Sequence, residues 1–208
     1  MKPNLRELAF ILIIGSLQPI VELITNSQIS TYYNGSAIFI AVIYVIYRIL
    51  KSKKIILIEW GFRLDNIKKC LLPYFISAVI GSTAIYCYGW YFGNTPLPIG
   101  FWYVIILYPI WGIMQQFALQ NFVARNLTNL VPSLPLRSLV TAILFACAHI
   151  PSIELVLLTF IVGFIFTYIY HYYSNLLLLG FAHGILGALV FHLVLNQNQW
   201  DILLKYFS

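Results

Sequence analysis

The chain has 208 residues, of which 61% are hydrophobic, 17% aromatic and 9% charged, and it carries a formal net charge of +6 with a mean hydropathy of +0.87. Because ordinary soluble domains contain about 25% charged residues, this composition excludes a soluble domain, a disordered chain and a disulfide-built secreted module. No Asp, Glu, Lys or Arg occurs from Cys70 to Ala124 or from Leu155 to Trp200. Each stretch is long enough for two spans of about 20 residues, which predicts an integral membrane protein.

The apolar windows predict an all-α, polytopic bundle of about seven transmembrane helices. In chain order they lie at residues 7–25, 36–50, 71–92, 102–124, 137–149, 154–172 and 176–196. Only helices satisfy every backbone group inside lipid without a closed barrel, and these windows lack the period-2 alternation of barrel strands. Residues 26–34, 93–100 and 128–135 are expected to be connecting loops. No repeat of solenoid length is visible, so residues 1–208 are expected to form a single transmembrane domain.

The basic residues indicate how the chain is oriented. Seven of the twelve Lys and Arg lie in the segment 48–69, namely Arg48, Lys51, Lys53, Lys54, Arg63, Lys68 and Lys69. The positive-inside rule places this segment in the cytoplasm, together with the N-terminus and its Lys2 and Arg6. Large apolar residues alternate with these cations, a mixture that favours an amphipathic segment lying on an anionic leaflet rather than a nucleic-acid interface.

Four carboxamides interrupt the fourth apolar window. They are Gln115, Gln116, Gln120 and Asn121, all within seven residues. Gln116 and Gln120 are four residues apart and share a helix face, and Gln115 lies about 100° from Gln116 around the helix axis. An unsatisfied amide is costly in hydrocarbon, so these side chains either join neighbouring helices by hydrogen bonds or line a functional site.

Two histidines lie at membrane depth in the predicted bundle. His149 follows Phe145 by four residues and ends a short helix just before Pro151. His183 lies about seven residues into the last span, roughly 10 Å from its start, and is therefore near the middle of the membrane. Gly187 lies one turn beyond His183 and is expected to leave open space beside the imidazole.

The remaining polar residues and the cysteines are expected to have structural roles. His171 and His192 are interpreted as structural or interfacial, and Glu22 and Glu154 as anchors at span ends. The three cysteines are isolated, with no close Cys and His cluster. Two histidines without a deep carboxylate or thiolate pair fall short of a metal-ligand set, so neither a metal nor another cofactor is expected.

Taken in order, the polar residues resemble the three motifs of the CPBP family, integral-membrane endopeptidases that include CAAX prenyl protease type 2 and bacteriocin-processing enzymes. The first family motif, Glu-Glu-x-x-x-Arg, aligns with residues 115–120, which read Gln-Gln-Phe-Ala-Leu-Gln. The second, Phe-x-x-x-His, is matched by residues 145–149, and the third, His-x-x-x-Asn, is half matched by residues 183–187. The resemblance covers residues 100–195, and the order and spacing of the motifs carry it.

The resemblance implies a division of labour among these residues. In such enzymes the first Glu and the second-motif His activate a water, while the third-motif His and Asn stabilise the oxyanion. Gln115 has no proton-accepting carboxylate and can only hold a water in place, which leaves His149 as the sole base. His183 could still donate to the oxyanion. Gln116 is expected to share the water-holding role, and the residues expected to line the binding cavity are Gln120, Asn121, Phe145 and Gly187.

Two functions from different classes remain open. One is an endopeptidase that hydrolyses a peptide bond of a membrane-associated substrate, and the other is a non-catalytic relative that binds a peptide or lipid segment in the same cavity. A retinal protein would need a Schiff-base lysine, but no Lys occurs between Lys69 and Lys205. A coupled transporter usually keeps an intramembrane carboxylate, which the predicted core lacks. The expected partners are membrane lipids and a peptide or protein substrate, and the expected location is a bacterial plasma membrane.

Overall fold

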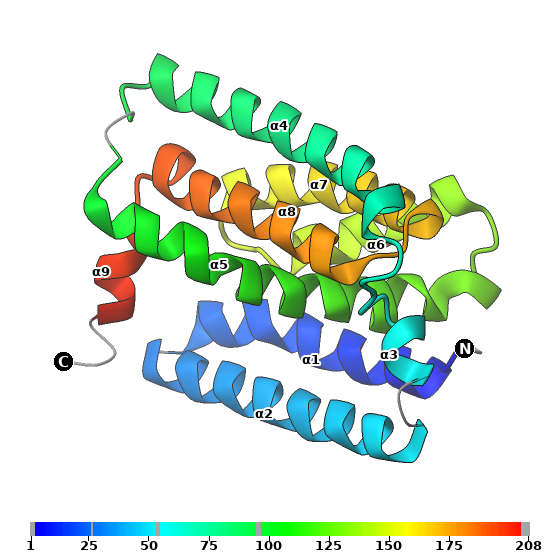
Figure 1. The fold of residues 1–208 in the computed structure, drawn as a ribbon. Helices are drawn as coiled ribbons and strands as arrows, with labels where there is room; N and C mark the ends of the chain where they lie inside the picture. The colour runs from blue at the N-terminus through cyan, green and yellow to red at the C-terminus, as the bar shows by residue number, and fades with distance from the viewer. Residues whose placement is uncertain (1–2, 26, 53–54, 95–96, 205–208) are drawn as a thin grey trace. The chain divides into compact units, whose positions relative to one another are not determined.

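The computed structural model describes residues 3–25, 27–52, 55–94 and 97–204, and these residues are almost entirely helical with no strand among them. The α-helices are α1 (Leu5–Ile24), α2 (Ser27–Ser52), α3 (Ile55–Glu59), α4 (Ile67–Tyr91), α5 (Ile99–Phe117), α6 (Leu134–Cys147), α7 (Ile153–Tyr172), α8 (Leu176–Leu189) and α9 (Gln199–Leu204) (Figure 1). Two π-helical segments, η1 (Ala118–Ala124) and η3 (Val190–Val194), and a 3₁₀ segment, η2 (Asn126–Asn129), complete them. Several residues used in the sequence predictions lie outside the described part: Lys2, Asn26, Lys53, Lys54, Pro96 and Lys205.

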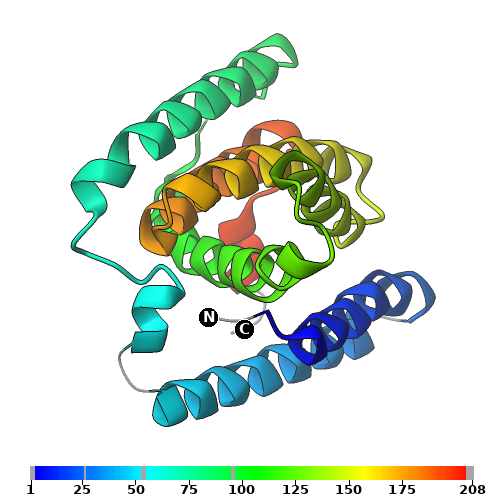
Figure 2. The same cartoon turned by 90° about the vertical axis from the view of Figure 1, so that its right-hand side faces the viewer.

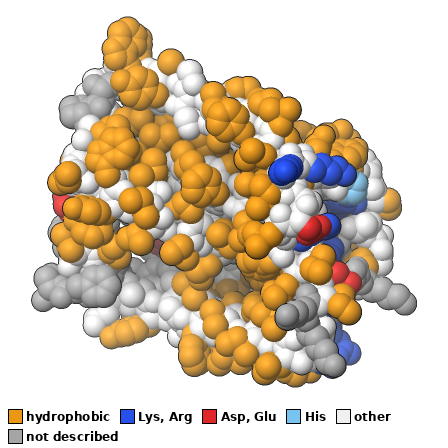
Figure 3. All heavy atoms as spheres, in the orientation of Figure 1, with side chains coloured by type: hydrophobic (Ala, Val, Ile, Leu, Met, Phe, Trp, Pro, Cys, Tyr) orange, Lys and Arg blue, Asp and Glu red, His pale blue; other side chains and the backbone are white. Residues whose placement is uncertain are grey.

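Among the described residues, six helical stretches are long and apolar enough to cross a membrane, which confirms an all-α integral membrane protein. They are Leu5–Ile24, Gln28–Ser52, Ile67–Tyr91, Ile99–Asn129, Ile153–Tyr172 and Leu176–Val194. The seventh expected span corresponds to α6, whose 14 residues measure about 21 Å, less than the hydrocarbon thickness of about 30 Å. Figure 3 shows hydrophobic side chains over most of the visible face, with Lys and Arg gathered near the beginning of α4.

The structure corrects one predicted loop. Residues 27–34, expected to connect the first two spans, form the first turns of α2. Their Ser, Gln, Thr, Tyr and Asn side chains interrupt the apolar pattern without breaking the helix. A helix can extend beyond the hydrocarbon into the headgroup region, where water hydrates polar side chains, so the polar composition does not mark the end of a helix there.

The described residues divide into two compact units, each built from two separate parts of the chain. Unit 1 contains residues 1–62 and 118–172, and unit 2 contains residues 63–117 and 173–208. The helical run Ile99–Asn129 contributes its first part, α5, to unit 2 and its second part, η1 and η2, to unit 1.

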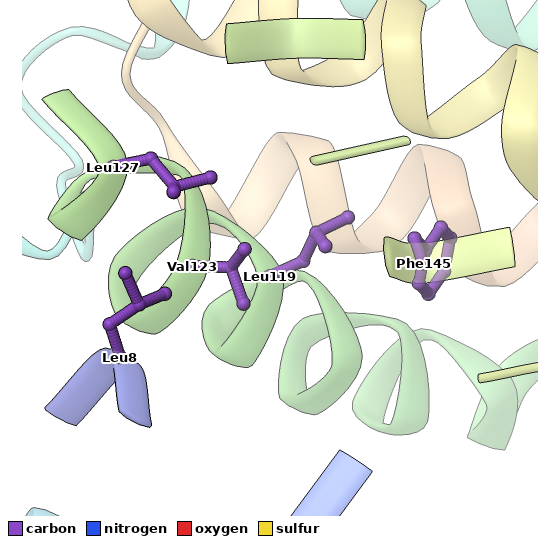
Figure 4. Packing of buried hydrophobic residues seen from close by; sticks show 5 residues of the cluster. All are labelled: Leu8, Leu119, Val123, Leu127 and Phe145. Atoms are coloured by element: carbon purple, nitrogen blue, oxygen red, sulfur yellow. The ribbon is translucent and has the colours of Figure 1, made fainter. Parts of the chain in front are cut away.

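In unit 1, α1 and α2 form an antiparallel hairpin and α6 packs against α7 (Figures 1 and 2). Asn4 caps α1 by accepting hydrogen bonds from the backbone N–H groups of Arg6 and Glu7. The core of this unit contains Leu8, Leu119, Val123, Leu127 and Phe145, shown together in Figure 4. These side chains join α1, the η1–η2 segment and α6, so the unit has one apolar centre between its two chain segments.

In unit 2, α8 lies between α5 and α4. Glycines set both contacts, because a Cβ on Gly81 of α4 would lie 2.8 Å from the Leu186 side chain of α8, and α5 meets α8 at further glycines. Asn175 caps α8 by accepting from the N–H of Leu178, and its amide donates to the carbonyl of Arg63 at 2.8 Å. Asn175 therefore sets the beginning of α8 and fixes it to the segment that precedes α4.

Candidate functional site

Gln115 and Gln116 lie near the end of α5 and hold the imidazole of His183 on α8. His183 Nδ1 lies 3.2 Å from Gln116 Nε2, and His183 Nε2 lies 2.9 Å from Gln115 Oε1. The two contacts agree on one tautomer, in which Nε2–H donates to Gln115 and Nδ1 accepts from the amide of Gln116. His183 and Gln116 are 7% and 0% exposed, whereas Gln115 is half-buried. We call these three side chains the glutamine–histidine clamp.

Glycines bring α5 and α8 close enough for the clamp to form. A Cβ on Gly112 would lie 2.3 Å from the carbonyl oxygen of Gly180, and a Cβ on Gly184 would lie 2.5 Å from Cα of Pro109. Side chains at these positions would collide with backbone, so the two helices touch along their main chains, as small residues allow in membrane helices. The polar side chains one turn away then reach across the interface.

The ring of Tyr108 fills the space beside Gly187. A Cβ on Gly187 would lie 2.7 Å from Tyr108 Cε1. The sequence predicts open space here, and the structure corrects this because it is occupied by an aromatic side chain of α5. Gly187 therefore contributes to the packing of α5 against α8.

His149 belongs to unit 1 and lies in the turn after α6, outside the six candidate spans. Its Nδ1–H donates to the backbone carbonyl of Phe145 at 2.8 Å, and the Phe145 ring meets the imidazole edge-on at 4.8 Å. The four-residue spacing of the second motif creates both contacts, and it leaves Nε2 as the nitrogen with a lone pair. Burial lowers the pKa of His149 below its ordinary value of 6.5, opposed in part by the Phe145 carbonyl. The imidazole is therefore neutral at pH 7, as a general base requires.

Gln120 and Asn121 are buried in η1 and bond to other residues of unit 1. Gln120 Nε2 donates to Thr167 Oγ1 on α7 at 3.2 Å. Asn121 Nδ2 donates to the Trp60 carbonyl at 3.2 Å, and Asn121 Oδ1 accepts from Arg125 at 3.2 Å. The four carboxamides therefore divide into two pairs, one holding His183 in unit 2 and one joining separate segments of unit 1.

A buried carboxylate at the start of α1 forms a charged network that the motifs do not predict. Glu7 is 7% exposed, and its Oε1 accepts from the Tyr44 hydroxyl and the Arg48 guanidinium. Its Oε2 accepts from Asn126 Nδ2 at 3.2 Å and lies 3.8 Å from the guanidinium of Arg125. We call these side chains the Glu7 network, which ties α1 and α2 to the segment after α5 within unit 1.

The ion pair between Glu7 and Arg48 could have been predicted from the sequence. Glu7 lies near the start of the first span and Arg48 near the end of the second. Two antiparallel helices of a hairpin bring these ends together, so opposite charges there predict an ion pair. Arg125 and Asn126 carry no such signal, because only the packing of unit 1 brings them to Glu7.

The other polar side chains singled out in the sequence have local contacts that fit structural roles. These are a hydrogen bond from Gln18 to Glu22 (2.8 Å), one from Ser152 to Glu154 (3.0 Å), a 3.4 Å approach of Arg137 to His171, and a ring contact between Phe101 and His192. Within the described ranges, no three His, Cys, Asp or Glu side chains gather as the ligands of a metal ion would.

Comparison with known proteins identifies the part of the chain that holds the motifs. Residues 96–189, a little under half of the chain, match the family described as Type II CAAX prenyl endopeptidase Rce1-like. The match confirms the CPBP resemblance. The matched residues include α5, the motif histidines His149 and His183, and all four carboxamides. Neither the curated proteins nor the solved structures contain a match to this chain.

Proposed function

On the premise that residues 96–189 belong to the Rce1-like type II CAAX prenyl endopeptidases, we propose that this membrane protein hydrolyses a peptide bond of a membrane-associated substrate. The observation that carries the proposal is the glutamine–histidine clamp. It joins the residues aligned with the first family motif to the histidine aligned with the third, although 67 residues separate Gln116 from His183. Prenylated CAAX tails, leader peptides and membrane-anchored tails are substrates of the appropriate chemistry.

The clamp gives Gln115 a fixed orientation and leaves donors for a ligand. Because Gln115 Oε1 accepts from His183, the plane of its amide is set, and the clamp uses neither N–H of its Nε2. Preoriented amide donors suit a substrate carbonyl oxygen, or a water held beside it. In the proposed reaction Gln115 and Gln116 hold the water, and His183, whose Nε2–H donates to Gln115, orients the amide whose Nε2–H groups stabilise the oxyanion.

His149 is proposed as the base. Its Nδ1–H bond to Phe145 fixes the tautomer whose Nε2 can accept a proton from water. No aligned carboxylate is present to share this task, because both Glu positions of the first motif are Gln.

The histidines give the first test. Purified protein in liposomes is expected to cleave a farnesylated CAAX peptide, and His149→Ala or His183→Ala should each lower kcat by about 100- to 10,000-fold. The double variant should lose little more than either single one, because such residues act as a unit. His192→Ala, whose ring contacts Phe101, is the matched control and should keep its activity. Cleavage at the wild-type rate in the double variant would overturn the proposal.

A second candidate function is binding without hydrolysis, as in a pseudoprotease. It is favoured by one observation: amides bond to both ring nitrogens of His183. The clamp therefore contains no group that can accept a proton from water, as hydrolysis requires. In the same liposomes this function predicts peptide binding without turnover, and Gln115→Glu with Gln116→Glu should then raise turnover above the wild type. An unchanged rate in that double variant would count against an inherited catalytic geometry.

We also propose that residues 1–208 act as one transmembrane domain with the N-terminus and the segment 48–69 in the cytoplasm. The chain passes between the two units three times, once within a continuous helix, so neither unit is a contiguous piece of chain. The excess of basic residues in the segment 48–69 supports the orientation.

A further inference from the structure

Two hydroxyl groups on α6 are completely buried without a hydrogen-bond partner among the described residues. They belong to Ser138 and Thr141, both 0% exposed. By contrast, the hydroxyl of Thr159 on α7 donates to the Leu155 carbonyl of its own helix at 2.6 Å. A buried hydroxyl with no partner is costly, so these two favour a partner that the described residues do not supply.

The face of α6 that carries these hydroxyls packs against α7. Ser138 and Thr141 share this face with Ala142 and Phe145, at the i, i+3, i+4 and i+7 positions. A Cβ on Gly163 of α7 would lie 3.3 Å from Ala142 Cα and 3.2 Å from Phe145 Cδ1. The two hydroxyls therefore point toward α7 and not toward lipid.

The register of the two helices places Thr167 at the level of Ser138 and Thr141. Arg137 of α6 approaches His171 of α7 at 3.4 Å, and Ala142 meets Gly163, so the helices are antiparallel. Thr141 lies between Arg137 and Ala142 on α6, and Thr167 lies correspondingly between Gly163 and His171 on α7. Thr167 is itself buried, at 3% exposure.

Thr167 links this interface to η1. Its Oγ1 accepts a hydrogen bond from Gln120 Nε2 at 3.2 Å, and its hydroxyl retains one proton to donate. Helices α6, α7 and η1 pack against one another within unit 1. Ser138, Thr141 and Thr167, which we call the hydroxyl row, thus lead to the carboxamide aligned with the Arg of the first family motif.

We propose that the hydroxyl row binds ordered water inside unit 1, between α6, α7 and η1. Water donates and accepts equally well, so it can pair with the hydroxyls of Ser138 and Thr141, which have no partner in the described part of the chain, and with the remaining proton of Thr167. Ser138 and Thr141 are about 4.5 Å apart along the helix axis, a spacing that one or two waters bridge. This water lies beside Gln120, inside a helix bundle otherwise surrounded by lipid.

Thermal unfolding of the full-length protein in detergent tests the water site. Ser138→Ala and Thr141→Val remove the hydroxyls with little change in shape, and each should lower the melting temperature by about 2–4 °C if a bound water is lost. Thr159→Val is the matched control, because that hydroxyl already bonds its own helix. A higher melting temperature in Thr141→Val than in the wild type would overturn the proposal, since it would show that the hydroxyl is buried dry.

A second measurement does not depend on the folding of variants. A crystallographic or electron-microscopic map of the wild-type protein that resolves ordered water should show density about 2.8 Å from Thr141 Oγ1 or Ser138 Oγ. Side-chain carbon in contact with both oxygens, with no water density, would contradict the site. Both measurements are made without substrate, so their outcome is separate from that of the proposed hydrolysis.

Discussion

Glu7→Ala is expected to lower the melting temperature of the detergent-solubilised protein by about 6–20 °C. Removing one partner of a buried ion pair costs about 3–5 kcal/mol, and each kcal/mol shifts the melting temperature of a chain of this size by about 2–4 °C. The cost is large here because Glu7, which is only 7% exposed, contacts four polar side chains together: Tyr44, Arg48, Arg125 and Asn126. Its loss leaves the guanidiniums of Arg48 and Arg125 without their carboxylate.

A control on the same helix and a paired substitution make this prediction specific. Glu22→Ala removes an exposed carboxylate of α1 that accepts from Gln18, and it should change stability by less than about 0.5 kcal/mol. Glu7→Gln should also lower the melting temperature, and adding Arg48→Met to that variant should recover part of the fall. The second substitution removes the guanidinium charge that the lost carboxylate had balanced. If Glu7→Ala and Glu22→Ala melt at the same temperature, the Glu7 network does not hold unit 1 together.

Gly184→Ala is expected to be strongly destabilising to unit 2. The new Cβ would lie 2.5 Å from Cα and 2.6 Å from N of Pro109, and backbone atoms cannot move aside as a flexible side chain can. Overpacking of this kind costs about 1–3 kcal/mol or more, which corresponds to a fall in melting temperature of at least about 2–12 °C. Forcing α5 from α8 should also break the glutamine–histidine clamp, so peptide binding or cleavage should fall with stability.

Gly15→Ala on α1 is the matched control, with an expected effect of opposite sign. No atom lies within 4 Å of the position that its Cβ would occupy. Alanine in the interior of a helix is favoured over glycine by about 0.5–1 kcal/mol, so this variant should melt slightly higher than the wild type. A Gly184→Ala protein as stable as the wild type would show that α5 and α8 do not touch at their backbones.

The helices were predictable because the chain repeats one strong signal, long apolar runs without charge. Every predicted window corresponds to an observed helix, from Leu5–Ile24 to Leu176–Val194. The start of α2 was missed because hydropathy reports the hydrocarbon layer and not helical structure, so the polar turns after residue 26 looked like a loop. The π-helical segments were also invisible, since the Arg125 N–H to Gln120 carbonyl bond depends on packing and not on composition.

The candidate site was predictable in its parts and not in their grouping. Motif spacing identified Gln115, Gln116 and His183, and the structure brings these three together. Helical periodicity alone suggested that Gln120 faces the same way as Gln116, but Gln120 bonds to Thr167 within unit 1. The ring of Tyr108 against Gly187 could not be foreseen, because it follows from the register of α5 against α8.

Photo-crosslinking tests most directly whether the glutamine–histidine clamp is a peptide site, whatever the rate of turnover. A farnesylated CAAX peptide carrying a benzophenone next to the scissile bond would be irradiated with the protein in lipid nanodiscs, and the attachment site mapped by mass spectrometry. We expect attachment on α5 or α8 close to Gln115 and His183, suppressed by excess unlabelled peptide and weakened by Gln115→Ala. Attachment confined to residues outside 96–189, or unaffected by competing peptide, would contradict the account.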